Sequence, residues 1–362
     1  MEIKIGSHRE YLNELVGLFA TVFGKISMEC WQWKHLHSPS WENEEPTLVL
    51  CFDSGQIVGA NGFMPTKFRS PFGDIKAMQS CESMIHPLYR GKNIFTNMLK
   101  HAELFFSNQG FHFLYGFPSD VSQQGLLRAG WNVVMTPCEY VKIISIKQLA
   151  KHAICSAINQ NVSGPENEPV FNMKEYDPGI KIEMYNSYPD ILDQTDKLYS
   201  SNNIELLRDQ KYLKWRIDQK PHGRYKYAVL SKKNELYGYL ILSINISKFG
   251  LRYGAIIDYR ILSTHVNRES NFLFMIDLID SAIKWFSQRK CCLVLFWGSK
   301  AANLERAFNF YNFRSVDRFP FNLKKRFACP LLIKPLSKDM EHVSLYMNST
   351  SWDVTSLYTD TA

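Results

Sequence analysis

A predicted strand, a short basic turn and a predicted helix follow one another within residues 78–105, and this order restricts the fold more than any other segment of the chain. The largely apolar run 78–85 is typical of a buried strand that ends at Pro87, and apolar residues at helical spacing begin at Ile94. A helix N-terminus presents unpaired backbone N–H groups and the positive end of the helix dipole. The Arg-Gly-Lys triplet at 90–92 adds positive charge and lets the backbone approach a ligand closely, so the turn is suited to a pyrophosphate.

The elements that follow give this turn a context. Residues 111–117 predict a second buried strand, residues 121–128 a short helix, and a Gly-Trp pair at 130–131 a stop before another strand. This order, together with the motif Pro-x-Tyr-Arg-Gly-Lys-x-Ile at 87–94, resembles the core of the GCN5-related N-acetyltransferase (GNAT) superfamily over about residues 2–142. The resemblance implies an α/β fold and an acyltransferase that uses acyl-CoA, with coenzyme A as its only cofactor.

Three positions depart from the superfamily pattern. The usual Arg or Gln before the first loop glycine is Leu88, and the second small residue of the loop is Asn93. Both changes are minor, because backbone N–H groups do most of the anion binding. The tyrosine that often protonates the departing thiolate in the superfamily is Leu126, so the identity of a general acid is open.

Composition limits the class of protein. A chain of 362 residues is too long for one such domain and suits two. The net charge of +7 suits an anionic ligand such as coenzyme A or a nucleotide diphosphate, while the lack of a long Lys/Arg run argues against nucleic acid. The eight cysteines show no metal-site or disulfide spacing. We see no signal-peptide pattern and no membrane-spanning run, so we expect a cytoplasmic protein that binds no metal.

The chain contains an internal duplication. Residues 31–39 are echoed by residues 212–221, because both segments contain a Trp followed by a basic residue and then a proline at matched spacing. Further echoes keep the same order, and the strand that carries Glu82 matches one that carries Asp258. Repetition at a nearly fixed offset is the signature of a repeated structural unit. We therefore predict two tandem GNAT-like domains with mixed, mostly antiparallel sheets.

The second copy lacks the phosphate turn. The matching segment 263–269 has no glycine, and its glutamate would repel a pyrophosphate. We interpret the C-terminal copy as a degenerate domain that binds no coenzyme and shapes the acceptor site. The predicted divisions are an acyl-CoA-binding GNAT domain at 1–160, a linker at 161–178, the degenerate domain at 179–335 and a polar tail at 336–362 that Trp352 could dock.

Acyl transfer to an amine makes three demands. The amine must lose a proton, the thioester carbonyl must be polarised, and the thiolate must be tolerated or protonated. The resemblance implies that backbone N–H groups at 83–85 polarise the carbonyl, beside a splay that admits the pantetheine arm. Glu82 on the same strand is the candidate base, since its pKa would rise toward neutrality among apolar neighbours. A half-exposed glutamate without a catalytic role is the equal alternative.

The candidate coenzyme-binding residues lie along the strand end, the turn and the start of the next short helix: Met84, Ile85, His86, Tyr89, Arg90, Gly91, Lys92, Asn93, Ile94, Phe95, Ser119 and Ser122. For His86 we favour a role in positioning the loop, because a residue before proline is held extended. Helix capping explains Ser119 and Ser122 equally well.

Three residues are candidates for substrate binding, namely Trp33, Arg216 and Asp258. Trp and Arg could stack on a nucleotide sugar and bind its phosphate groups. The Trp-basic pair occurs in both copies, however, which favours a packing motif, since only one copy needs a substrate. Asp258 is interpreted as a relic of the duplication or as a substrate contact.

Tandem chains of this kind resemble two groups of transferases. One group N-acylates nucleotide-linked amino sugars of bacterial surface polysaccharides, such as lipopolysaccharide O-antigen or capsule, and the other is the Fem-type aminoacyl transferases. The intact Arg-Gly-Lys turn favours a CoA thioester, so the hypothesis is direct attack by an amino sugar in a ternary complex. A non-catalytic module that senses acyl-CoA is the alternative from another class. The oligomeric state stays open, with a homodimer among the alternatives.

Overall fold

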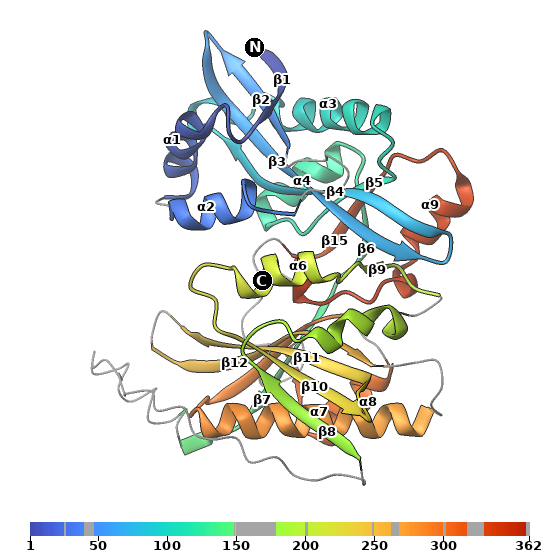
Figure 1. The fold of residues 1–362 in the computed structure, drawn as a ribbon. Coiled ribbons are helices and arrows are strands. Elements are labelled where there is room, and N and C mark those ends of the chain that lie inside the picture. Colours follow the sequence, from blue (N-terminus) through green and yellow to red (C-terminus); the bar gives the residue numbers. More distant parts are fainter. Residues whose placement is uncertain are drawn as a thin grey trace.

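The computed structural model describes residues 1–24, 27–39, 47–147, 149, 179–199, 202–247, 250–261, 268–299, 302–316 and 329–359. The predicted linker at 161–178 and residues 263–267 of the second-copy turn lie outside these ranges. The described chain forms two mixed β-sheets, one in each of two units that lie one above the other in Figure 1. This is the tandem GNAT-like α/β fold that the sequence predicts.

The first unit is built on an eight-stranded sheet. Its path is β1 (Glu2–Ser7), β2 (Thr47–Asp53), β3 (Gln56–Ser70), β4 (Gly73–Ile85), β5 (Phe113–Gly116), β15 (Leu331–Pro335) and β6 (Asn132–Met135), with β9 (Glu205–Leu206) beside β3. Its helices are α1 (Leu12–Phe23), α2 (Met28–His35), α3 (Ile94–Asn108) and α4 (Asp120–Arg128). Among the described strands of this sheet, only β4 and β5 pair in parallel, since α3 carries the chain across between them. The predicted helix from Ile94 is confirmed.

The second unit repeats this plan on a seven-stranded sheet. Its strands are β8 (Ile180–Tyr185), β10 (Tyr225–Lys232), β11 (Glu235–Ile246), β12 (Arg252–Ile261), β13 (Leu293–Gly298), β7 (Cys138–Ile143) and β14 (Arg314–Ser315). Helices α7 (Arg268–Gln288) and α8 (Ala302–Phe310) cover its outer face, whereas α6 (Gln210–Leu213) lies between the units (Figure 1). The turn η3 (Lys214–Asp218) continues α6.

The two sheets exchange one strand each. Strand β15, near the end of the chain, lies between β5 and β6 of the first sheet. Strand β7, from the N-terminal half, lies between β13 and β14 of the second sheet. Each exchanged strand occupies the same place in its sheet, so the duplicated units are closed reciprocally. A division of the chain at 161–178 therefore separates segments that complete one another's sheets.

A shared core joins the units. Side chains from both sheets form one hydrophobic cluster that also includes the end of the chain: Trp352, Val354, Leu357 and Tyr358 are all buried within it. This segment follows α9 (Met340–Met347) and includes the short turns η5 (Ser349–Ser351) and η6 (Ser356–Tyr358). Trp352 is buried in this cluster, so the described part of the polar tail is a core element rather than an appendage. Its apolar residues face inward while its Ser and Thr residues make the turns.

Candidate functional site

The predicted phosphate turn links β4 to α3 through the short 3₁₀ turn η1 (Pro87–Tyr89). Gly91 and Asn93 both have left-handed backbones, with φ of 79° and 58°. In the described chain, the backbone N–H groups of residues 91–93 donate to no protein acceptor, and Arg90 and Lys92 are exposed. The Tyr89 hydroxyl donates to Asp53 Oδ2 at 2.9 Å, which ties the turn to the end of β2. The turn thus presents unpaired N–H groups and two cations at a helix N-terminus.

Beside this turn β4 and β5 part, and we call the stretch where they are no longer paired the slot. The parallel pairing of the two strands runs only from Ala77 opposite Phe113 to Gln79 opposite Tyr115. Strand β4 continues for six more residues, to Ile85, with β3 as its partner. The edge of β4 that faced β5 is therefore released over residues 80–85. The family resemblance implies a splay at this place, which would admit a pantetheine arm.

Strand β4 carries a β-bulge within the released stretch. Met84 pairs with Ala60 and Cys81 pairs with Gly62, so the two residues between them oppose Asn61 alone. The first of these two, Glu82, has a φ of 49°, a left-handed value that side-chain-bearing residues seldom adopt in a strand. The bulge changes the direction of the following peptide groups, 83–85, which are those expected to polarise a thioester carbonyl.

Glu82 is held by two consecutive residues of α2. Lys34 Nζ lies 2.8 Å from Glu82 Oε1, and His35 Nε2 lies 2.5 Å from Glu82 Oε2. The side chains are 10%, 0% and 14% exposed for Lys34, His35 and Glu82. Burial raises the pKa of Glu82, but the charges of Lys34 and His35 and their hydrogen bonds outweigh it, so the pKa lies well below its ordinary value. The neighbours are cationic or polar rather than apolar, so the condition for a raised pKa is not met.

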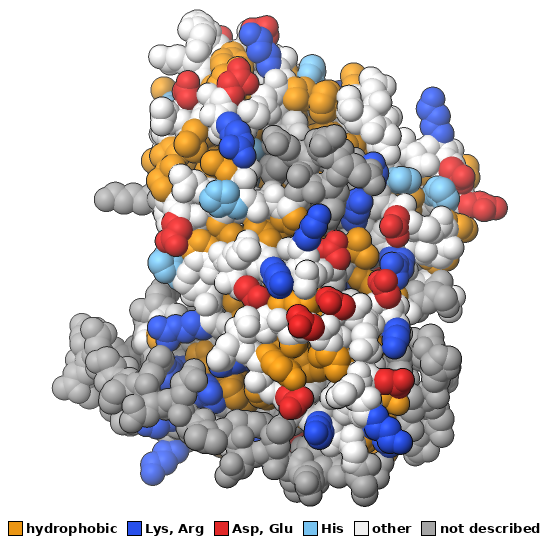
Figure 2. Space-filling view, viewed as in Figure 1, with side chains coloured by type: hydrophobic (Ala, Val, Ile, Leu, Met, Phe, Trp, Pro, Cys, Tyr) orange, Lys and Arg blue, Asp and Glu red, His pale blue; other side chains and the backbone are white. Residues whose placement is uncertain are grey.

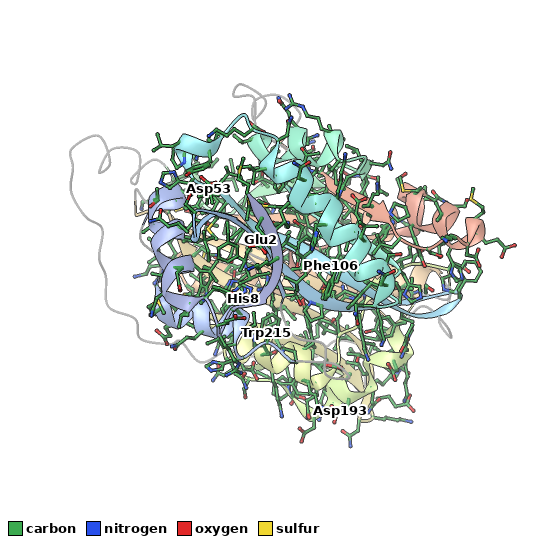
Figure 3. The ribbon with its side chains drawn as sticks, turned by 90° about the horizontal axis from the view of Figure 1, so that it is seen from above. Glu2, His8, Asp53, Phe106, Asp193 and Trp215 are labelled. Carbon is green, nitrogen blue, oxygen red and sulfur yellow. The ribbon has the colours of Figure 1, made fainter. Side chains whose placement is uncertain are left out.

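A second histidine lies behind this contact. The ring of His8, just after β1, stacks on His35 with 3.9 Å between centroids and meets Trp31 edge-on (Figure 3 labels His8 beside α2). His8 is buried, and neither of its ring nitrogens has a hydrogen-bond partner in the described chain. Burial and the charges of His35 and Lys34 lower the pKa of His8 to about 2. His8 is therefore neutral at physiological pH.

His8 should make the folded protein sensitive to acid. The unfolded chain binds a proton at His8 near pH 6.5, whereas the folded chain does not until about pH 2. Acidification below pH 6.5 should therefore lower the free energy of unfolding, by about 2 kcal/mol at pH 5. Glu82, whose pKa is also lowered, adds to this only below about pH 4.5, where its carboxylate protonates in the unfolded chain. Between pH 5 and 7, the free energy of unfolding measured in urea should change less with pH in His8→Phe than in wild type.

The control is His222→Phe, at an exposed histidine, which should keep the pH dependence of wild type. An equal pH dependence in wild type and both variants would contradict the conclusion that His8 is neutral in the folded protein.

Polar side chains also hold the unpaired stretch of β4 against β3. Ser83 Oγ donates to Asn61 Oδ1 at 2.7 Å, and Asn61 Nδ2 donates to Ser80 Oγ at 3.2 Å. Asn61 is fully buried, while the two serines are partly exposed. The amide thus fastens both sides of the bulge.

The residues at the start of α4 have a capping role. Ser122 Oγ accepts a hydrogen bond from the Ser119 N–H at 3.0 Å, as in a capping box. Phe95 of α3 packs over Gly125 of α4, where an added Cβ would lie 2.4 Å from the ring. Leu126 is buried in the core beneath. The position of the usual thiolate-protonating tyrosine therefore holds a packing residue.

In the second unit, the chain itself enters the corresponding place. Strands β12 and β13 pair in parallel as far as Ile256 and Phe296. Beyond that point the Ser299 N–H donates to the Val354 carbonyl at 2.8 Å, and Thr355 Oγ1 donates to Asp258 at 2.6 Å. The end of the chain thus bonds to β12 and to the residue that follows β13, where the first unit has its slot.

Asp258, the counterpart of Glu82, belongs to a buried network. Arg208 donates to both of its oxygens at 2.7 and 3.0 Å, and the Tyr239 hydroxyl donates at 2.8 Å. The side chain has no exposed surface through which a substrate could reach it. We therefore do not propose Asp258 as a substrate contact.

The two Trp-basic pairs meet across the interface between the units. Trp33 Nε1 donates to the Trp215 carbonyl and Trp215 Nε1 donates to the Trp33 carbonyl, both at 2.8 Å, while the rings stack at 5.2 Å. Arg216 lies over both rings, donates to the Thr359 carbonyl and is 2% exposed. The packing interpretation of the motif explains these contacts, so Trp33 and Arg216 are not carried into the acceptor site either.

Sequence reasoning missed the residues that surround Glu82. His8, Lys34, His35 and Asn61 are not among the site residues that the sequence predicts. The only sequence signal was that Lys34 and His35 follow the conspicuous Trp33 on a short helix. In the described chain, no group of three or more His, Cys, Asp or Glu side chains is arranged to hold a metal ion. No helix of the described residues has the length and apolar character needed to cross a membrane.

Comparison with known proteins agrees with this geometry. Residues 7–134 match the family model described as an acetyltransferase (GNAT) domain. No curated protein sequence matches the chain. Similar solved structures include a GCN5-related N-acetyltransferase from Anabaena variabilis ATCC 29413, with TM-score 0.63 and 12% identity over 93% of this chain and 73% of that one.

Two further structures are similar over most of their length. Saccharomyces cerevisiae N-myristoyltransferase with bound myristoyl-CoA gives TM-score 0.54 and 11% identity over 92% of this chain and 78% of that one. A tandem GNAT protein from the clavulanic acid biosynthesis pathway gives TM-score 0.53 and 11% identity over 93% of this chain and 100% of that one. At such identities the likeness shows the fold, which is that of tandem GNAT proteins.

Proposed function

We propose that this protein is an N-acyltransferase that moves an acyl group from acyl-CoA to the amine of a nucleotide-linked amino sugar. The observation that carries the proposal is the contrast between the two units. The first has an unpaired basic turn at a helix N-terminus and a parted strand pair beside it. In the second, the end of the chain occupies the corresponding place. Coenzyme A is therefore assigned to the first unit alone.

Each part of the coenzyme has a matching feature in the first unit. The N–H groups of residues 91–93, with Arg90 and Lys92, would hold the pyrophosphate, and the slot between β4 and β5 would admit the pantetheine arm. Tyr89 and His86 support the turn, and Ile94 and Phe95 anchor it to the core of the first unit. Ser119 and Ser122 lie at the start of α4, which packs on α3.

The acceptor would approach from the side of the slot that faces α2 and the second unit. In this arrangement thioester and amine meet in a ternary complex, and the amine attacks the carbonyl directly. Support for an amino sugar comes from the motif resemblance, and the net charge of +7 suits a nucleotide diphosphate.

A non-catalytic acyl-CoA-sensing module is the second candidate. Two observations favour it, since Leu126 replaces the usual acid and Glu82 is a weak proton acceptor at its lowered pKa. Under the enzyme hypothesis the amine would then arrive neutral and release its proton to solvent.

Thiol release separates the two candidates. Acetyl-CoA and longer acyl-CoAs would be mixed with a panel of UDP- and dTDP-amino sugars, and free CoA thiol would be measured against controls without acceptor. We expect acceptor-dependent thiol release with at least one pair. Acyl-CoA binding by calorimetry without thiol release from any pair would favour the sensing module.

A further inference from the structure

We infer that Glu82 is a positioning residue: clamped by Lys34 and His35, it holds the β4 bulge that aims the peptide groups of 83–85 at the thioester. The inference rests on the proposed function and changes the role of Glu82 within it. The sequence analysis makes this residue the candidate base that removes a proton from the amine. The geometry points instead to the backbone as the part of Glu82 that matters for the reaction.

The backbone of Glu82 is in an unfavourable conformation for its side chain. Its φ of 49° lies in the left-handed region, and two β4 residues oppose Asn61 alone. Bulges of this kind usually place glycine at the left-handed position, because glycine has no Cβ to clash with the following carbonyl. A glutamate keeps this conformation only if its surroundings hold it there.

The side chain supplies that restraint. Each carboxylate oxygen already accepts from one residue of α2, Lys34 at 2.8 Å and His35 at 2.5 Å. His8 stacks on His35 from behind, and its neutral ring adds no competing charge. On the opposite strand, Asn61 binds Ser80 and Ser83 on either side of Glu82. The bulge is therefore fastened from α2 on one side and from β3 on the other.

The clamp also reaches the second unit. Lys34 and His35 directly follow Trp33, whose ring and indole N–H are fixed on Trp215. The second unit thereby fixes α2, and α2 fixes Glu82. This gives the degenerate unit a role in catalysis through the bulge, without requiring it to contact a ligand.

Glycine at position 82 separates positioning from proton transfer. Glu82→Gly removes the carboxylate but adopts the left-handed conformation without cost, whereas Glu82→Ala removes the carboxylate and disfavours that conformation. We expect kcat of Glu82→Gly to stay within about tenfold of wild type and kcat of Glu82→Ala to fall at least about tenfold below Glu82→Gly. The pH–rate profile of Glu82→Gly should keep the acidic limb of wild type. Melting temperatures would confirm that each variant is folded at the assay temperature.

The opposite pattern would overturn the inference. If Glu82 is the base, both variants should lose about 10²–10⁴ in kcat alike, and both should lose the acidic limb. The contact of Lys34 with the Glu82 carboxylate is tested by changing Lys34. Lys34→Met should lower kcat at least about tenfold with little change in the KM for acyl-CoA, and Lys34→Arg should keep most of the wild-type kcat. A Lys34→Met variant with wild-type kcat would also contradict the inference. Failure of the proposed function is distinct, because wild-type protein would then release no thiol.

Discussion

Arg90→Glu is expected to weaken CoA binding by at least about 100-fold. A charge-assisted hydrogen bond contributes about 1.5–3 kcal/mol, and reversing the charge adds repulsion to the loss of that contact. Arg90 is exposed at the turn between η1 and α3, where neighbouring N–H groups have no acceptor in the described chain. Isothermal titration calorimetry of CoA would measure the change, and wild-type protein should bind one CoA per chain.

The matched control is Arg314→Glu. Arg314 is exposed on β14 of the second sheet. Its replacement by glutamate changes the net charge by the same amount as Arg90→Glu, but in the other unit. Its CoA affinity should equal that of wild type at moderate salt, where distant exposed charges are screened. Equal weakening by both variants would mean that only the overall charge matters. Two CoA per chain in wild type would contradict the assignment of coenzyme to the first unit.

The paired tryptophans should show a large and coupled effect on stability. Trp33→Ala and Trp215→Ala should each lower the free energy of unfolding by about 3–5 kcal/mol, because each removes a buried ring and a hydrogen bond across the interface. The double variant should cost less than the sum of the single variants. Each single variant already abolishes the stacking, although the remaining indole can still donate to the backbone carbonyl at the substituted position. The second change therefore has less to remove, and a coupling of about 0.5–1.5 kcal/mol is expected.

Trp285→Ala provides the control for this cycle. Trp285 is buried in α7 against the second sheet and belongs to a separate cluster from the paired tryptophans. Its removal should be as costly as that of Trp215, but its effect should add to that of Trp33→Ala within about 0.5 kcal/mol. Urea unfolding of all the variants would give these values. Additivity between Trp33→Ala and Trp215→Ala would show that the reciprocal contact contributes little to the joining of the units.

The reciprocal contact also explains why the Trp-basic motif occurs twice. In each copy the motif lies at the interface and meets its counterpart 182 residues away. A feature that serves packing between two copies must be present in both, whereas a substrate contact need be present in only one. The buried positions of Trp33 and Arg216 follow from this symmetry.

Local patterns in the amino-acid sequence specify the individual elements of this protein. The strand, phosphate turn and helix around residues 78–105 follow from hydrophobic period and turn residues that act within a few positions of one another. The duplication and the absence of a glycine turn in the second copy are likewise properties of the sequence alone. Together they indicated two similar α/β units and one coenzyme site, before any tertiary contact was considered.

The way in which the units complete one another depends on contacts between segments that are distant in the sequence. Strands β7 and β15 have no local feature that says which sheet they join, because the pairing depends on edges formed by distant segments. The partners of Glu82 lie more than forty residues away, on α2, and they reverse the direction of its pKa. The polar tail joins the core because the second unit offers it a place beside β13. Charge compensation and strand exchange depend on positions in space, which a periodic pattern of residues does not specify.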